Sequence, residues 1–473
     1  MRTKHVVAFA IAGVLTLAFV PPVASGKRAA PAAAELTFKR PVFVSDPEDP
    51  NQFAAEPSIR AARDGSLYIA APTGLGNVRT NSESGGGDVI WRSDDGGRTW
   101  NFLGSLDNQQ GGGDADIAPD RDGVLWGSGL TLANTTAAIS VDKGENWNSN
   151  PVGSLSAVVD RQWIETYKAE PFAFMTTGEI GQGSIILSRL ESLPGDIPAV
   201  SNTVTVSGAD SYQWPGEIAV DERNDLVYVA YNTSGGRKDD IVVARTDLNL
   251  GDAQKFKVTT TRGDSFDSFV GIDVDRAGNV YATWTERRRK GKNGKDGSTN
   301  SYVSVSKNEG KTWSDPVKLN GGPRTTTFPW LVAGSNGRVA IAYYGTKARG
   351  PSPENVTFTG RPVPKWRVWV AYSLNATGAR PTYKEAAALT PTAFLHEGDV
   401  CTSGTGCADG ARDLLDFFQI DLDECGKMVI TYTDNSRDEV TVSGRGENGP
   451  ELVSFVAQKG GPKFYKKPLN ADC

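Results

Sequence analysis

The chain has 473 residues, a formal net charge of −6, and a composition that includes 53 glycines, 11 tryptophans and only three methionines. The net negative charge argues against a general nucleic-acid binder. Because long helical patterns are absent, the glycine- and aromatic-rich composition excludes a helical bundle and predicts many short strands joined by tight turns.

The first 26 residues predict a secretory signal peptide. Arg2 and Lys4 precede an apolar run over 6–20, and small residues over 24–26 offer a cleavage point. An Ala/Pro-rich linker over 27–35 follows, and no later segment is long and apolar enough to span a membrane. We therefore expect a secreted, extracellular monomer without a membrane span, folded as one domain over 36–473.

One unit recurs seven times: an acidic or aromatic start, a short apolar strand, a turn, and a second apolar strand. The copies begin at Glu56, Asp114, Asp160, Pro215, Phe269, Phe328 and Leu414. A third strand follows most copies, and four strands per repeat are typical of a propeller blade. The prediction is an all-β, single seven-bladed β-propeller of four-stranded antiparallel blades, with a six-bladed propeller as the alternative. Either 36–44 or 463–467 is expected to complete the last blade.

Three repeats continue into near-identical turns over 93–100, 140–147 and 306–313, which read SDDGGRTW, SVDKGENW and SKNEGKTW. In this S-x-D-x-G-x-T-W pattern, the Asp can accept backbone N–H bonds and the Gly can take positive φ. The Trp can anchor the turn in the core. Asn146 replaces the usual Thr and Asn308 the usual Asp, and both keep a side-chain oxygen.

On these turns the chain resembles the sialidase superfamily of Asp-box (BNR-repeat) propellers over nearly its whole mature length. The resemblance implies a secreted glycan-active hydrolase, an exo-acting glycosidase with sialidase activity among the options. The same turns occur in polysaccharide lyases and in non-enzymatic propellers, so a lyase and a propeller that binds glycans or protein partners remain alternatives.

The chain also departs from the family pattern, which suggests a divergent member. Sialidases generally have six blades and an Arg-Ile-Pro motif in the first blade. This sequence has seven repeats, and Arg40 precedes Pro41 without the isoleucine. The family's arginine triad is therefore not assigned to residues of this chain.

The candidate site is expected where the innermost strands begin. If the S-x-D-x-G-x-T-W turns join third and fourth strands, they lie on one face and the long irregular segments on the other, where binding usually resides. Carboxylates with interspersed arginines suit carbohydrate chemistry. The candidates are Glu217 and Asp116 as acid/base groups, Tyr212 as nucleophile, and Asp160, Arg161, Asp267, Arg324 and Arg412 as substrate-binding residues. Each of these charges could instead neutralise a neighbour or cap a strand end.

Four cysteines, all in the last quarter, predict disulfides in an exported protein. Of three connectivities we favour Cys401–Cys407 with Cys425–Cys473. No cofactor is expected, although the carboxylates over 114–122 leave calcium open. His396 is the base that a lyase would use. The expected partner is a carbohydrate or glycoconjugate.

Overall fold

The computed structural model describes residues 35–73, 87–108, 111–131, 134–156, 158–180, 183–192, 196–208, 213–233, 238–263, 265, 269–287, 299–350, 353, 363–389, 393–402, 413–436, 451–470, and the terminal Met1 and Cys473. Within these residues, no helix has the length and apolar character needed to cross a membrane. A 3-10 turn, η1 (Pro50–Gln52), precedes the first blade.

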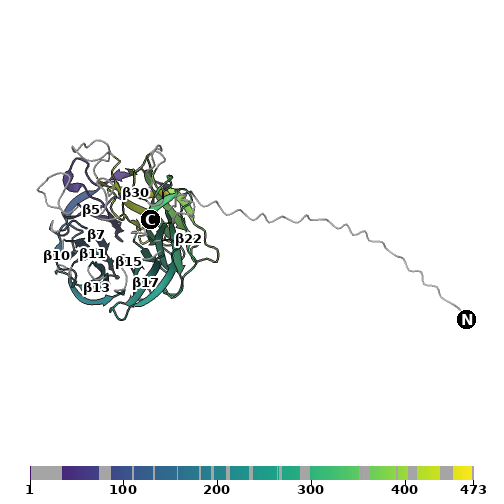
Figure 1. Ribbon diagram of the computed structural model, residues 1–473, viewed down its shortest axis with the longest axis horizontal. Coiled ribbons are helices and arrows are strands. Elements are labelled where there is room, and N and C mark those ends of the chain that lie inside the picture. Colours follow the sequence, from purple (N-terminus) through teal and green to yellow (C-terminus); the bar gives the residue numbers. More distant parts are fainter. Residues whose placement is uncertain are drawn as a thin grey trace.

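Seven antiparallel sheets form a closed ring, so the protein is a seven-bladed β-propeller (Figure 1). From the innermost strand outward, the first four blades are β3 (Ser58–Ala61), β4 (Leu67–Pro72), β5 (Asp88–Ser93) and β6 (Asn101–Ser105); β7 (Ala115–Pro119), β8 (Leu125–Leu130), β9 (Thr135–Ser140) and β10 (Asn148–Asn150); β11 (Val159–Thr166), β12 (Phe172–Glu179), β13 (Ile185–Glu191) and β14 (Ala199–Thr205); and β15 (Gln213–Asp221), β16 (Leu226–Thr233), β17 (Asp240–Asp247) and β18 (Gln254–Thr260).

The other three blades are β19 (Gly271–Val274), β20 (Val280–Arg287), β21 (Thr299–Ser306) and β22 (Val317–Lys318); β23 (Thr325–Ala333), β24 (Val339–Thr346), β25 (Lys365–Ser373) and β26 (Lys384–Ala387); and β28 (Ile420–Leu422), β29 (Met428–Asp434) and β30 (Leu452–Gly460). A short strand, β27 (His396–Glu397), pairs with β25. The predicted all-β, seven-bladed fold is confirmed, and the six-bladed alternative is wrong.

The N-terminal end of the folded chain completes the last blade. Strands β1 (Thr37–Phe38) and β2 (Val42–Phe43) both pair with β30, and the innermost strands β28 and β3 contact each other. Of the two predicted closures, the N-terminal one is correct, since 463–467 forms no strand. The closed ring leaves few strand edges exposed.

The hydrophobic core lies between neighbouring blades. Tyr68 and Ile90 of the first blade, for example, form one buried cluster with Ile117 and Leu125 of the second. Both faces of each sheet are covered by a neighbour, which explains why these strands are apolar on both sides.

The three S-x-D-x-G-x-T-W turns connect third to fourth strands, as expected. In the first, Asp95 accepts hydrogen bonds from the N–H groups of Arg98 (2.8 Å) and Thr99 (3.0 Å). Gly97 has a φ of +79°, and Trp100 packs against Phe455 of the last blade. Because strands alternate in direction, these turns lie at the same end of the ring as the hairpins that join first to second strands.

A disulfide joins Cys425 to Cys473, as predicted, and ties the C-terminus to the hairpin between β28 and β29. Cys401 is buried. Its expected partner, Cys407, lies outside the described residues, so that pairing stays a prediction.

Candidate functional site

The channel at the centre of the ring is lined by seven innermost strands, each with one edge that faces the axis and has no neighbouring strand. Backbone N–H groups on such an edge need acceptors when they are buried. Polar side chains of the preceding blade supply them. The bonds run from Ile59 to Gln419 (3.1 Å), from Ala61 to Asp421 (2.8 Å), from Ile164 to Asp116 (3.0 Å), from Ile272 to Glu217 (3.0 Å) and from Ala333 to Asp273 (2.7 Å).

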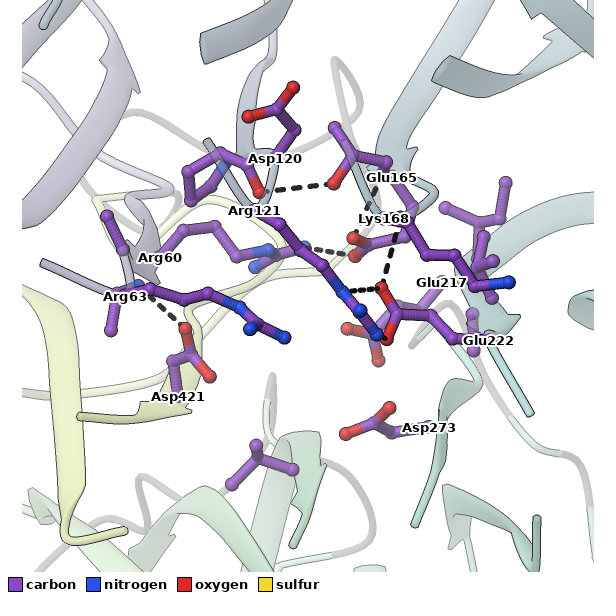
Figure 2. Close-up of a pocket in the computed structure, with 18 of the residues that line it drawn as sticks. Arg60, Arg63, Asp120, Arg121, Glu165, Lys168, Glu217, Glu222, Asp273 and Asp421 are labelled. Carbon is purple, nitrogen blue, oxygen red and sulfur yellow. Dashed lines mark hydrogen bonds and ion pairs between the residues drawn. The ribbon is translucent and has the colours of Figure 1, made fainter. Parts of the chain in front are cut away.

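A cavity of about 250 Å³ opens where the innermost strands end, on the face that carries the first hairpins (Figure 2). Arg60, from β3, extends into it beside acidic groups of several other blades. Its Nη2 atom lies 3.7 Å from Asp116 Oδ2 and 3.9 Å from Glu165 Oε2. The same cavity is lined by four carboxyls, those of Glu165, Glu217, Asp273 and Asp421. The single guanidinium of Arg60 therefore lies among several acidic groups.

Several of these carboxyls have pKa values close to neutrality. Burial raises the pKa of Glu165 and that of Asp273 to about 7, and that of Asp421 to about 6, while Arg60 opposes the rise. Burial also raises the pKa of Glu217 well above its usual range. At neutral pH the cavity therefore holds both protonated carboxylic acids and ionised carboxylates, which general acid–base catalysis requires.

Two of the carboxyls differ from the rest in how fully they are bonded. Both oxygens of Asp273 and both of Asp421 accept backbone N–H bonds. Glu217 accepts one, at Oε2, and leaves Oε1 without a hydrogen-bond partner among the described residues. Glu165 accepts only from the N–H of Thr166, and its side chain is 28% exposed. Glu165 is thus partly exposed, whereas Glu217 is buried (6% exposed) but lines the cavity with one carboxyl oxygen not bonded to a described residue.

The rim of the cavity is basic and partly neutralised. Arg121 pairs with Glu222, and the N–H of Lys168 donates to the same carboxylate (3.0 Å). Arg63 is exposed, and Figure 2 shows its guanidinium extending toward the middle of the cavity. A guanidinium in this position can bind a carboxylate of a ligand in a bidentate manner.

The opposite end of the channel holds a second charged cluster, around Arg161. Its guanidinium pairs with Glu56 (3.2 Å), Asp114 (2.9 Å) and Asp416. The adjacent Asp160 has its pKa raised to about 6 by burial and by the charge of Asp114. Arg161 is 7% exposed, so its own carboxylate partners occupy it.

An aromatic cluster separates the two charged ends. Trp163 contacts Trp330, Phe269 and Phe417 at ring-centroid distances of 4.8, 5.6 and 4.7 Å. Arg161 lies over the ring of Phe269, 4.7 Å from its centroid. Trp163 stands between Arg161 and Glu165 on β11, so buried aromatic rings lie between the two charged clusters.

The predicted site residues divide between these places. Glu217 lines the cavity, and Asp116 lies behind Arg60, fully buried. Asp160 and Arg161 belong to the opposite end, and Arg324 has an exposed side chain just before β23. Tyr212, Asp267 and Arg412 lie outside the described residues and stay predictions, as do most of the long loops.

His396 is buried with both ring nitrogens engaged. Nδ1 lies 3.0 Å from Asn435 Oδ1, and Nε2 lies 3.0 Å from the carbonyl oxygen of Asp399. These bonds give the histidine a structural role, and the lyase alternative stays a prediction.

Sequence reasoning missed four residues of the cavity: Arg60, Glu165, Asp273 and Asp421. The predicted residues were taken from the starts of the innermost strands, whereas these four stand one position after an isoleucine that six of the seven hairpins share, Leu331 replacing it in the sixth. A charged residue inside an otherwise buried strand is a signal of a lined channel, and aligning the seven copies on that isoleucine would have revealed it.

The carboxylates over 114–122 do not converge on a common point. Asp120 accepts bonds within its own hairpin turn, from the N–H groups of Asp122 (2.8 Å) and Val124 (2.9 Å). Among the described residues, one grouping of potential metal ligands combines Glu424 with Cys425 and Cys473. Since these cysteines form a disulfide, they cannot act as thiolate ligands.

The chain matches no family model and no curated protein, whereas several solved structures resemble it. An α-L-arabinofuranosidase from Fusarium graminearum is 16% identical, with 65% of this chain and 93% of that chain covered and a TM-score of 0.44. The endosialidase of phage phi92 (9% identity, 90% and 69% covered, TM-score 0.45) and a Hadza microbial sialidase (14%, 89% and 68%, TM-score 0.43) also match.

The likeness is one of fold. Sialidases are among the solved structures that the chain resembles, and membership of that superfamily stays a prediction. Any statement about activity has to rest on the residues of the channel.

Proposed function

We propose that this protein is a glycan-active hydrolase, an exo-acting glycosidase, whose reacting groups lie in the cavity around Arg60. The observation that carries the proposal is the cavity itself, which Glu165 and Glu217, two carboxyls of raised pKa, line together with Arg60. Glycoside hydrolysis needs one protonated acid and one ionised carboxylate on either side of the scissile bond.

Glu217 and Glu165 fit these two roles. Glu217, with the more strongly raised pKa, is the general acid that protonates the leaving oxygen. Glu165, beside Arg60 and with a pKa of about 7, supplies the ionised carboxylate as base or nucleophile. Asp116 is a positioning residue in this scheme, because it holds Arg60 and the backbone of Ile164.

The arginines favour an acidic sugar. Arg63 at the rim and Arg60 inside the cavity provide cationic groups in a site otherwise rich in carboxyls. A sugar that carries its own carboxylate would pair with them, so sialosides and uronides are the first substrates to test.

The test measures hydrolysis of a panel of fluorogenic glycosides by the mature protein. We expect cleavage of an acidic member and a loss of about 10²- to 10⁴-fold in kcat/KM for Glu165→Gln and Glu217→Gln. Asp160→Asn, at the opposite end of the channel, is the matched control and should retain activity. Circular dichroism and the melting temperature establish that each variant is folded.

Two results would contradict the proposal. In the first, Asp160→Asn loses activity and both glutamate variants keep it. The site would then lie on the face of the long loops, where substrate binding was expected from Arg161, Arg324, Arg412 and Asp267. In the second, the folded wild-type protein hydrolyses none of the glycosides. That result would favour the non-catalytic propeller, and a glycan array would then be used to find its ligand.

A further inference from the structure

Asp88 is a buried carboxylate that the channel does not use. It begins β5 and has no exposed surface. Neither of its oxygens accepts a hydrogen bond of ordinary geometry, and it forms no ion pair with a described residue. The N–H groups of Gly112 and Leu130 lie near it, but burial and the neighbouring charges of Asp107 and Asp114 outweigh them and raise its pKa well above the usual range. Leaving a carboxylate in this state is costly.

Other oxygens surround the same place. A methyl group added to Gly111 would lie 2.2 Å from Asp107 Oδ2, 2.8 Å from Asp88 Oδ2 and 2.8 Å from the carbonyl oxygen of Leu130. A methyl group on Gly129 would lie 2.1 Å from Asp88 Oδ2. Oxygens of three separate segments therefore face one small region, and glycines leave that region open where any other residue would fill it.

The segments come from two neighbouring blades. Asp88 and Asp107 stand at adjacent ends of β5 and β6 in the first blade, where the N–H of Asp88 donates to Asp107 Oδ1 (3.3 Å). Leu130 ends β8 in the second blade, and Gly113 donates its N–H to the carbonyl of Leu130 (3.2 Å). Asp107 is 2% exposed, so two acidic side chains are buried together at a junction between blades.

We propose that Asp88, Asp107 and the carbonyl of Leu130 form a calcium site that joins the first two blades. Calcium takes six to eight oxygen ligands and combines mono- and bidentate carboxylates with backbone carbonyls and water. Magnesium keeps most of its own water and is rarely held in a cage made by the protein. A divalent cation neutralises both buried carboxylates at once, which no described side chain does for Asp88.

This site differs from the calcium option raised by the sequence. That option used the stretch over 114–122, where Asp120 is occupied by its own turn and Asp122 is exposed. The proposed ligands come instead from Asp88 and Asp107, which lie outside that stretch and meet in the folded chain.

The experiment titrates calcium chloride into the full-length mature protein, stripped with EDTA and desalted, by isothermal titration calorimetry. Melting temperatures are measured in parallel with calcium and with EDTA. We expect one bound ion and a melting temperature that rises with calcium concentration, since a ligand of the native state stabilises it. Asp88→Asn should weaken binding by at least about tenfold and remove the thermal shift, whereas Asp122→Asn, the matched control, should keep both.

Three outcomes would overturn the proposal: no heat and no thermal shift with the wild-type protein, undiminished binding by Asp88→Asn, or loss of binding in Asp122→Asn alone. If Asp88→Asn does not fold, Asp107→Asn takes its place with the same expected loss.

Discussion

Replacing Asp273 by asparagine tests whether the channel carboxyls are protonated in the folded protein. Asp273 accepts N–H bonds from Val274 (2.6 Å) and from Ala333 of the next blade (2.7 Å), and burial raises its pKa from 3.8 to about 7. Asparagine has nearly the shape of the protonated acid but cannot ionise. The variant removes the titration and also loses one of the two N–H bonds, because an amide nitrogen cannot accept, but that second loss is the same at every pH.

The expected effect follows from proton linkage. A carboxyl whose pKa is higher in the folded state than in the unfolded state makes stability fall as pH rises between those two values. The rise in the pKa of Asp273 from 3.8 to about 7 corresponds to about 4 kcal/mol of unfolding free energy. Because water reaches the cavity, we expect about half of that effect. Relative to wild type, Asp273→Asn should gain about 2 kcal/mol of unfolding free energy between pH 4 and pH 8.

The assay is urea unfolding followed by tryptophan fluorescence at pH 4, 6 and 8. The quantity of interest is the difference between variant and wild type, because other carboxyls with raised pKa values contribute equally to both. Asp315→Asn, which replaces an exposed carboxylate, is the control and should show a difference independent of pH. A difference for Asp273→Asn that is the same at pH 4 and pH 8 would refute the reasoning.

Three further predictions concern the turn, the disulfide and the pH dependence of activity. Hydrogen bonds from Thr99 lower the pKa of Asp95 to about 2, against the opposing effect of partial burial. Asp95→Ala should therefore lower the free energy of unfolding in urea by about 1 kcal/mol above pH 4 and by less toward pH 2. An unchanged urea midpoint would contradict this prediction. Cys473→Ser opens a disulfide that spans 48 residues and should cost about 2 to 4 kcal/mol; reduction of the wild type should lower its melting temperature at least as much. If Glu165 acts as base, activity should rise as pH increases through about 7, and a flat kcat/KM profile from pH 5 to 8 would exclude that role.

The candidate site shows where prediction from the sequence stops. Glu217 was chosen as a candidate at the start of an innermost strand, but it stands in the middle of β15 and lines the cavity at the end where these strands finish. Glu165 and Arg60 were not chosen, although their places in the repeat are equally clear. Their importance comes from meeting side chains of other blades, and a pattern within one repeat contains no information about such partners.

Burial changed the interpretation of other charges as well. Arg161 was expected to bind an anionic substrate, yet the folded chain surrounds it with Glu56, Asp114 and Asp416. Which carboxylates reach an arginine depends on how the blades are set around the axis. Each of these partners belongs to a different blade from Arg161, so the neutralising cluster exists only in the closed ring.

The sequence alone determined the features that depend on neighbours along the chain. Alternating and fully apolar strands, hairpin turns, and the bonds of Asp95 within its own turn all follow from residues a few positions apart. The tertiary structure decided what depends on distance through space. It selected the N-terminal strands to close the ring, brought Asp88 and Asp107 to the junction with Leu130, and raised the pKa values around Arg60. Burial and long-range charge act on a group through its surroundings, and those surroundings come from all seven blades at once.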